Sequence, residues 1–238
     1  NAKQFFYKII TKKSLKHADL YTVTSECDKN FLIEQFGKIN SPKIEIRKNW
    51  VSLNNFKKLK PFEERYSKKI VCVGRIEDQK NYKTIVSALG GTDFTIDIFG
   101  EGTEKNEITK LAKKQNVEIK FRGIINNNEL KELLTNYKYY LTASKFEGNP
   151  KSVLEAMSAG CLVIASDIKN HKEFLNNENS ILFRDINSLN EILKNLDKNQ
   201  YDFKNLIENS LQTVKNNYSL ENIARLELKD IEKLLSTP

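Results

Sequence analysis

The sequence alternates between short apolar runs and longer segments with helical spacing. Eight runs have the length and β-branched content of strands: residues 20–25, 44–49, 69–74, 94–100, 117–123, 139–144, 161–167 and 180–183. The segments between them, such as residues 81–89, 103–115 and 127–137, repeat apolar residues every three or four positions. This alternation predicts βαβ units and an α/β fold with a Rossmann-like, doubly wound parallel sheet.

The alternation is interrupted between residues 50 and 67, and a new strand is expected to begin at Lys69. Residues 1–50 hold a helix, a strand, a helix and a strand, too few elements to close a core. We therefore expect a chain cut from a longer one, with a domain tail at 1–52, a linker at 53–67, a complete Rossmann-like domain at 68–216 and an amphipathic helix at 217–238 that packs back on the amino-terminal part.

Composition argues against a membrane-spanning helix and against a metal site built from cysteines. The longest apolar runs fall far short of the roughly 20 residues of a membrane helix. The net charge of +8 comes mostly from lysines spread along the chain, which leaves three interpretations open: solubilising charge, attraction to an anionic lipid or phosphate-bearing substrate, and nucleic-acid binding. Three cysteines without CxxC spacing are expected to be buried free thiols in a reducing compartment, with no metal site.

The loops after the strands are the expected ligand sites, because open α/β sheets bind ligands beyond the carboxyl ends of their strands. In the loop GRIEDQKN, Arg75 and Lys80 bracket a short turn after Gly74. A planar guanidinium and a mobile ammonium suit a diphosphate. A solvated basic loop is the alternative.

Two further loops carry glycines. The turn FGEGTE contains Gly100 and Gly102, which let a backbone approach a ligand closely, although the third glycine of a dinucleotide fingerprint is missing. In RGIINNNEL, Gly123 follows a strand and Asn128 is a candidate helix cap. An ordinary strand-to-helix turn is the favoured interpretation of both loops.

The stretch KFEGNPKSVLEAMSAG holds the most specific pattern. Asn149 is expected to cap a helix whose first residue is Pro150, and Gly160 to end it. The first amides of such a helix form an anion site. Glu147 precedes that site and Glu155 lies about 1.5 turns into the helix, so the two carboxylates flank a phosphate without sharing it.

These motifs, in this order and spacing, resemble the carboxyl-terminal half of a family-4 glycosyltransferase of the GT-B fold. The E-x7-E element followed by EAM-x-x-G-x-x-V-I-A-S-D is specific, whereas the glycine turns are weak. The segment from Ala18 to Ser52 is similar to the last βαβ unit of the family's amino-terminal domain and its hinge. Two departures are Asn81, where the family often has glycine, and the hinge sequence KNWVS.

The resemblance implies a retaining hexosyltransferase that uses a nucleotide-diphosphate sugar and no essential metal or other cofactor. Its catalytic group would be Glu147 against the sugar, with Arg75 and Lys80 on the diphosphate. The donor-binding positions would be Gly74, Gly100, Gly102, Gly123, Gly148, Asn149, Lys151, Ser152, Val153 and Glu155, with Glu155 on the ribose. Glu173 matches a recurring acidic position whose role the sequence does not give.

The implied partners are the donor and a glycan or lipid-linked acceptor, in bacterial surface polysaccharide or glycolipid synthesis. The expected location is the cytoplasm, at the inner face of the membrane. The helix FFYKIITKKSLKH has two candidate uses, docking on another domain or peripheral contact with that membrane.

Three rivals remain: a glycoside hydrolase with a carboxylate pair, a non-catalytic GT-B-like binding or scaffold subunit, and a nucleic-acid binder. The isolated His17 and His171 are expected at the surface.

Overall fold

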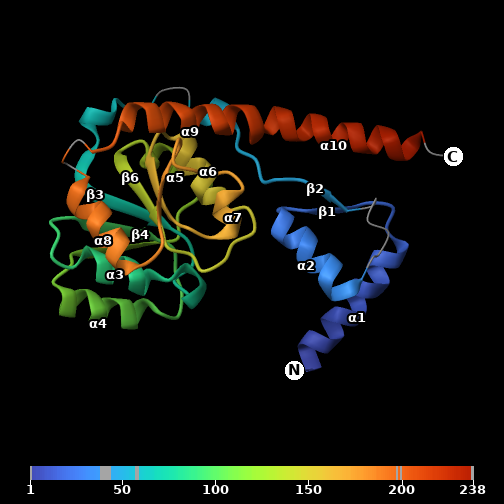
Figure 1. Cartoon of the computed structure of the whole chain (residues 1–238), viewed down its shortest axis with the longest axis horizontal. Helices are drawn as coiled ribbons and strands as arrows, with labels where there is room; N and C mark the ends of the chain where they lie inside the picture. The colour runs from blue at the N-terminus through green and yellow to red at the C-terminus, as the bar shows by residue number, and fades with distance from the viewer. Residues whose placement is uncertain (1, 38–43, 57–58, 197, 199, 237–238) are drawn as a thin grey trace.

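The computed structural model describes residues 2–37, 44–56, 59–196, 198 and 200–236, and a parallel sheet of six strands dominates it (Figure 1). The strands are β3 (Tyr66–Val73), β4 (Thr95–Phe99), β5 (Ile119–Gly123), β6 (Tyr137–Thr142), β7 (Leu162–Ser166) and β8 (Ile181–Phe183). Their order is β5-β4-β3-β6-β7-β8, so the chain winds outward in both directions and leaves a switch point between β3 and β6. The predicted α/β fold and the six expected strands are confirmed.

Helices cover both faces of this sheet. One face carries α3 (Tyr82–Leu89), α4 (Lys105–Gln115) and α8 (Ile186–Asn195), and the other carries α5 (Asn127–Leu134) and α6 (Lys151–Ser158). The helix α9 (Phe203–Asn217) contributes Leu206 to the first core and Val214 to the second. Neighbouring residues in one strand enter different cores: Ile70 packs on the first face and Val71 on the second. Burial on both faces explains why the inner strands β4, β6 and β7 are continuous apolar runs in the sequence, whereas the edge strand β5 alternates half-buried and exposed residues.

The first strand of the sheet begins earlier than expected. β3 starts at Tyr66 rather than at Lys69, and its pairing with β6 shifts register between Tyr66 and Ile70. The polar residues at its start gave no apolar periodicity from which this extension could be predicted.

Arg65, directly before β3, is buried although it lies in the expected linker. Its exposed fraction is 6%, and its guanidinium donates to the carbonyls of Ala159 (2.9 Å) and Gly160 (2.8 Å) at the end of α6. Burial lowers its pKa. The preceding residues form two short 3-10 helices, η2 (Leu53–Phe56) and η3 (Phe62–Glu64).

The amino-terminal elements form a separate group in Figure 1. They are α1 (Ala2–His17), β1 (Tyr21–Val23), α2 (Glu26–Phe36) and β2 (Ile44–Ile46), with β1 parallel to β2. The expected order of helix, strand, helix and strand is confirmed. Ile9 and Ile10 of α1 are exposed, while the side chains of Phe5 and Phe6 lie outside the described residues.

The last helix, α10 (Leu220–Leu235), runs from the sheet past the amino-terminal elements (Figure 1). Ser219 caps it, and the amide of Leu220 donates to the carbonyl of Val51 at 3.0 Å. Arg47 forms an ion pair with Asp230. In the described part of the chain, no helix combines the length and the apolar character needed to cross a membrane.

Candidate functional site

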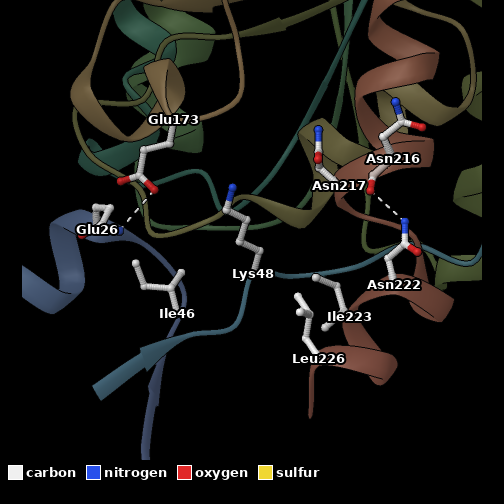
Figure 2. A pocket seen from close by; sticks show the side chains of 9 residues that line it. All are labelled: Glu26, Ile46, Lys48, Glu173, Asn216, Asn217, Asn222, Ile223 and Leu226. Carbon is white, nitrogen blue, oxygen red and sulfur yellow. Dashed lines mark hydrogen bonds between the residues drawn. The ribbon is translucent and has the colours of Figure 1, made fainter. Parts of the chain in front are cut away.

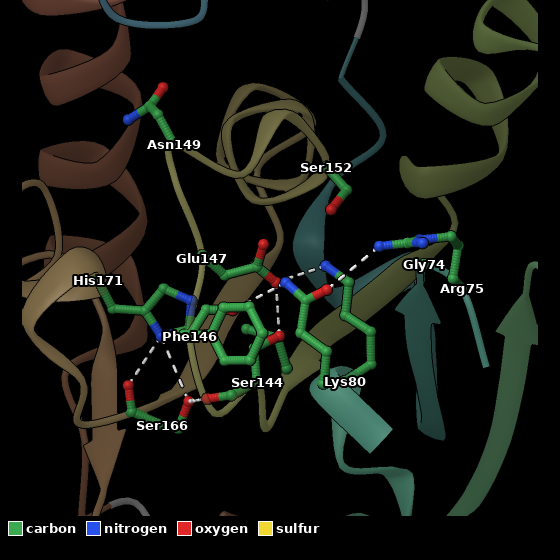
Figure 3. Close-up of polar contacts among 12 residues, drawn as sticks. Gly74, Arg75, Lys80, Ser144, Phe146, Glu147, Asn149, Ser152, Ser166 and His171 are labelled. Carbon is green, nitrogen blue, oxygen red and sulfur yellow. Dashed lines mark hydrogen bonds and ion pairs between the residues drawn. The ribbon is translucent and has the colours of Figure 1, made fainter. Parts of the chain in front are cut away.

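The loops that follow β3 and β6 meet at the switch point of the sheet. Lys80 ends the 3-10 turn η4 (Asp78–Lys80) of the first loop, and Glu147 lies in the second. Their side chains form an ion pair, with Lys80 Nζ 2.5 Å from Glu147 Oε1 and exposed fractions of 16% and 9% (Figure 3). The fold thus brings together two residues 67 positions apart.

The Glu147 carboxylate has a fixed orientation. Ser144 Oγ donates to Oε1 at 2.6 Å, so this one oxygen receives both Ser144 and Lys80. Among the described residues, none donates to Oε2. The carboxylate therefore presents one engaged oxygen and one that can accept a hydrogen bond from a ligand.

Gln79 joins the two loops. Its side-chain amide donates to the backbone carbonyl of Phe146 at 2.9 Å, and its backbone carbonyl accepts from the backbone amide of Lys145 at 2.9 Å. Arg75 is exposed and donates to Gln79 Oε1 at 3.2 Å. The two expected basic residues therefore differ in position. Lys80 contacts Glu147 directly, whereas Arg75 is linked to the Glu147 loop through Gln79.

The helix after the second loop begins one residue later than expected. Its N-cap is Pro150, its first residue is Lys151, and it has no side-chain cap. The expected cap, Asn149, is 5% exposed and binds the segment before the sheet: its Oδ1 accepts from the Asn49 amide at 3.0 Å, and its carbonyl accepts from the Asn49 side chain. Asn149 lies one residue before the N-cap, and its side chain binds Asn49 instead of the helix amides.

The start of α6 still presents two donors. Among the described residues, the amides of Lys151 and Ser152 have no acceptor, whereas the Val153 amide donates to the Pro150 carbonyl at 3.1 Å. The two free amides expected at the start of this helix, those of Lys151 and Ser152, are therefore present. These amides lie at the positive end of the helix dipole, where an anion is stabilised.

Glu155 is buried in the second turn of α6, with an exposed fraction of 3%. Burial raises the pKa of its carboxyl, and the charges of Lys151 and Lys131 act in the opposite direction. Its Oε1 has no hydrogen-bond partner among the described residues. A buried acceptor without a donor is costly, so a ligand hydroxyl at this oxygen would be favourable.

The glycines at this edge of the sheet serve contacts between loops. A Cβ on Gly100 would lie 2.0 Å from the carbonyl oxygen of Gly74, and one on Gly102 would lie 2.3 Å from that of Ile76. Gly123 ends β5 and bridges to Gly100. Close packing of the loops on one another is thus sufficient to explain why Gly100 and Gly102 lack side chains.

Two other predictions about this edge were wrong. The cap of α5 is Asn126, whose side chain accepts from the amides of Asn128 and Glu129, so Asn128 is a helical residue. His171 is fully buried rather than at the surface. His17 is exposed, as expected.

His171 lies beside the serines of the site (Figure 3). Its Nδ1 is 2.8 Å from the carbonyl oxygen of Ser166, which fixes the proton on Nδ1, and Ser166 Oγ donates to the Ser144 carbonyl at 2.7 Å. Burial lowers the pKa of His171, and its Nε2 has no partner among the described residues. Ser144 and Ser166 were missed as site residues; their place at strand ends was the available signal.

The cysteines agree with the sequence only in part. Cys72 and Cys161 are buried free thiols whose pKa values burial raises, but Cys27 is partly exposed. Within the described ranges, no three His, Cys, Asp or Glu side chains gather in a group that could hold a metal ion.

Residues 54–213 match the model of the family described as glycosyl transferases group 1. The chain belongs to this family. It is 30% identical over 156 residues to an N-acetylgalactosaminyltransferase of Campylobacter jejuni that is named for a diphospho-undecaprenol acceptor. That match covers 64% of this chain and 42% of the relative.

An uncharacterised glycosyltransferase of Methanocaldococcus jannaschii is 27% identical over 99% of this chain and 64% of its own length. The chain thus spans less than two thirds of these relatives.

Solved structures agree on the fold. Anabaena HepE, in complex with UDP and glucose, superposes with a TM-score of 0.84 at 14% identity, covering 95% of this chain and 66% of HepE. The pneumococcal O-GlcNAc transferase GtfA, in complex with UDP and GlcNAc, has a TM-score of 0.75 at 21% identity, covering 92% of this chain and 46% of GtfA. The GT-B Rossmann-like fold expected from the sequence is confirmed by these neighbours.

Proposed function

We propose that this chain carries the donor site of a retaining transferase that moves a hexose from a nucleotide-diphosphate sugar to a glycan or lipid-linked acceptor. The observation that carries the proposal is the cluster at the switch point: the Lys80–Glu147 pair beside the open amides of Lys151 and Ser152. A cation, two amides and an oriented carboxylate suit a diphosphate linked to a sugar.

Each group has a distinct part in this proposal. Arg75, Lys80 and the start of α6 neutralise the charge that develops on the leaving diphosphate, which is electrostatic catalysis without a metal. Oε2 of Glu147 accepts a hydrogen bond from a hydroxyl of the transferred sugar, because Oε1 already accepts from Lys80 and Ser144. Glu155 accepts a ribose hydroxyl at its unpartnered Oε1.

The whole protein is proposed to follow the division into regions expected from the sequence. Residues 1–52 are the tail of an acceptor domain, 53–67 a linker, 68–216 the donor domain and 217–238 a helix that returns to the acceptor domain. A lipid-linked acceptor is supported by the name of the C. jejuni relative. We propose that the reaction belongs to surface polysaccharide or glycolipid synthesis and takes place at the cytoplasmic face of a membrane.

Calorimetry with UDP, GDP, ADP and the free nucleosides tests the donor site. We expect one nucleotide to bind, and Arg75→Ala to weaken that nucleotide roughly tenfold or more while the nucleoside changes little, since a charged hydrogen bond contributes about 1.5–3 kcal/mol. Lys120→Ala, which removes an exposed lysine of β5, is the matched control.

Failure of all three nucleotides to bind at millimolar concentration would refute the donor site. Equal weakening of nucleotide and nucleoside would refute the role of Arg75. Turnover of a nucleotide sugar by the full-length protein in the presence of a chelator tests metal independence.

A further inference from the structure

Glu173 makes a contact that its place in the sequence did not reveal. It follows the short helix α7 (Lys169–Lys172), and its carboxylate reaches the start of α2 in the amino-terminal group (Figure 2). Oε2 accepts from the amide of Glu26 at 3.2 Å, and Oε1 accepts from the amide of Cys27 at 3.3 Å. An acid from the donor side therefore binds the first two amides of a helix 146 residues earlier in the chain.

This contact completes the cap of α2. Ser25 is the N-cap, and its side chain accepts from the amide of Asp28 at 3.0 Å. With Glu173 on the two preceding amides, the first three residues of α2 all have acceptors. A carboxylate is favoured there because the amino end of a helix is positive.

Polar contacts matter here because α2 brings no buried apolar residue to the contact. No described residue of α2 is buried. A cavity of 490 Å³ lies beside the contact and is lined by Lys48 and Glu173, among others (Figure 2). Since α2 contributes no buried residue, the hydrogen bonds to Glu173 are among the contacts that set where its first turn lies.

The first turn of α2 lies against the loop that carries Glu147. A Cβ on Gly148 would lie 2.8 Å from Thr24 Oγ1 and 3.4 Å from Asp28 Oδ2. Thr24 in turn donates to Asp28 at 2.6 Å. The contacts that fix the first turn of α2 therefore also fix the surface that lies next to Gly148 and Glu147.

We propose that Glu173 is a positioning residue, which holds the first turn of α2 on the Glu147 loop and so completes the donor cleft. The contact itself is independent of the proposed function; only its consequence for donor binding rests on that function. Glu173 acts through α2 and does not touch the donor.

The thiol of Cys27 reports on the contact without any donor. Burial is the largest cause of the raised pKa of Cys27, and the hydrogen bond to Glu173 and the charge of Glu173 raise it further. The charge of Asp28 also raises this pKa, and the charge of Lys169 lowers it. Cys72 and Cys161 are buried, so iodoacetamide labels Cys27 fastest in the native chain. Cys27→Ser identifies its signal by removing it.

In the 238-residue chain, Glu173→Ala is expected to raise the labelling rate of Cys27 roughly 2- to 30-fold, the range of a lost helix cap, and to move the pH profile of labelling to lower pH. Glu173→Gln keeps the size and one acceptor, so it should fall between. Glu178→Ala, which removes an exposed acid five residues later, should match the wild type. If Glu173→Ala labels like Glu178→Ala, the contact does not exist in solution and the proposal fails.

Donor affinity of the same variants tests the consequence. Glu173→Ala is expected to weaken nucleotide-sugar binding several-fold, and Glu173→Gln to restore part of it. Faster labelling with unchanged affinity would overturn the positioning role. If labelling responds while neither the wild type nor any variant binds a donor, the contact between Glu173 and α2 is supported and the proposed function fails instead.

Discussion

The sheet region (residues 66–217) and the amino-terminal region (residues 2–37 and 44–47) are built in different ways. All five residues of β7 in the sheet region are buried, and the helices on both sides cover continuous cores. In the amino-terminal region, α2 buries no residue, and β1 and β2 pair only with each other. The sheet region is thus built around two packed cores, whereas Leu15 and Ile44 are the buried apolar side chains among the described residues of the amino-terminal region.

This difference indicates how the site is divided. Lys80 precedes the buried Tyr82, and Glu147 lies between β6 and α6, so both are anchored by core residues. The amino-terminal side reaches the sheet region through hydrogen bonds: the Cys27 amide of α2 donates to Glu173, and the Asn49 amide, in the segment before the sheet, donates to Asn149. The Lys80–Glu147 side of the site is therefore anchored by the packed core, whereas the first turn of α2 contributes no buried residue to its side.

The largest difference in the free energy of unfolding should separate two isoleucine-to-alanine variants, one in each region. Ile164→Ala in β7 removes a fully buried side chain and should lower the free energy of unfolding by about 2–5 kcal/mol, because it leaves a cavity. Ile10→Ala in α1 removes a side chain that is 45% exposed and should change it by less than about 0.5 kcal/mol. Urea unfolding measures both, and similar losses would show that the amino-terminal region has its own core.

The sheet region could be predicted from the sequence because burial on both faces produces continuous apolar runs. The six strands of the sheet and the helices α3, α4 and α5 follow from that pattern and from helical spacing. The start of β3 was missed because Tyr66, Ser67 and Lys68 are polar or exposed and have no such pattern.

The polar contacts of the site could not be predicted in the same way. Asn149 has the spacing of a helix cap, yet its side chain binds Asn49, which is 100 positions away. His171 and Arg65 belong to residue types common at surfaces, but carbonyls from the sheet region accept their protons in the interior. Such partners are chosen by the tertiary fold, and one sequence holds no local signal for them.

A smaller effect should separate two lysine–carboxylate pairs in neighbouring loops. Lys80→Met should lower the free energy of unfolding by about 1–3 kcal/mol, because it leaves the Glu147 carboxylate, 9% exposed, with Ser144 alone. Lys145→Met, which breaks the exposed pair with Asp78, should have no measurable effect.

A double-mutant cycle isolates the coupling within the first pair. Adding Glu147→Gln to Lys80→Met should recover part of the loss, since the unpaired charge is removed. Additive losses would mean that the two side chains do not interact in solution.

The smallest effect should separate the two histidines, one from each region. Burial lowers the pKa of His171 below the 6.5 of a free histidine, so the unfolded chain binds the extra proton more readily. The stability that this neutral histidine contributes is complete above pH 6.5 and is lost as the pH falls towards its folded pKa, with a slope of at most about 1.4 kcal/mol per pH unit. His171→Gln should therefore flatten the decline of unfolding free energy between pH 7 and pH 5, whereas His17→Gln, in the exposed part of α1, should keep the slope of the wild type. Equal slopes in the wild type and both variants would place His171 in contact with water. The hydrogen bonds that link His171 through Ser166 to Ser144, next to the Glu147 loop, would then not be buried.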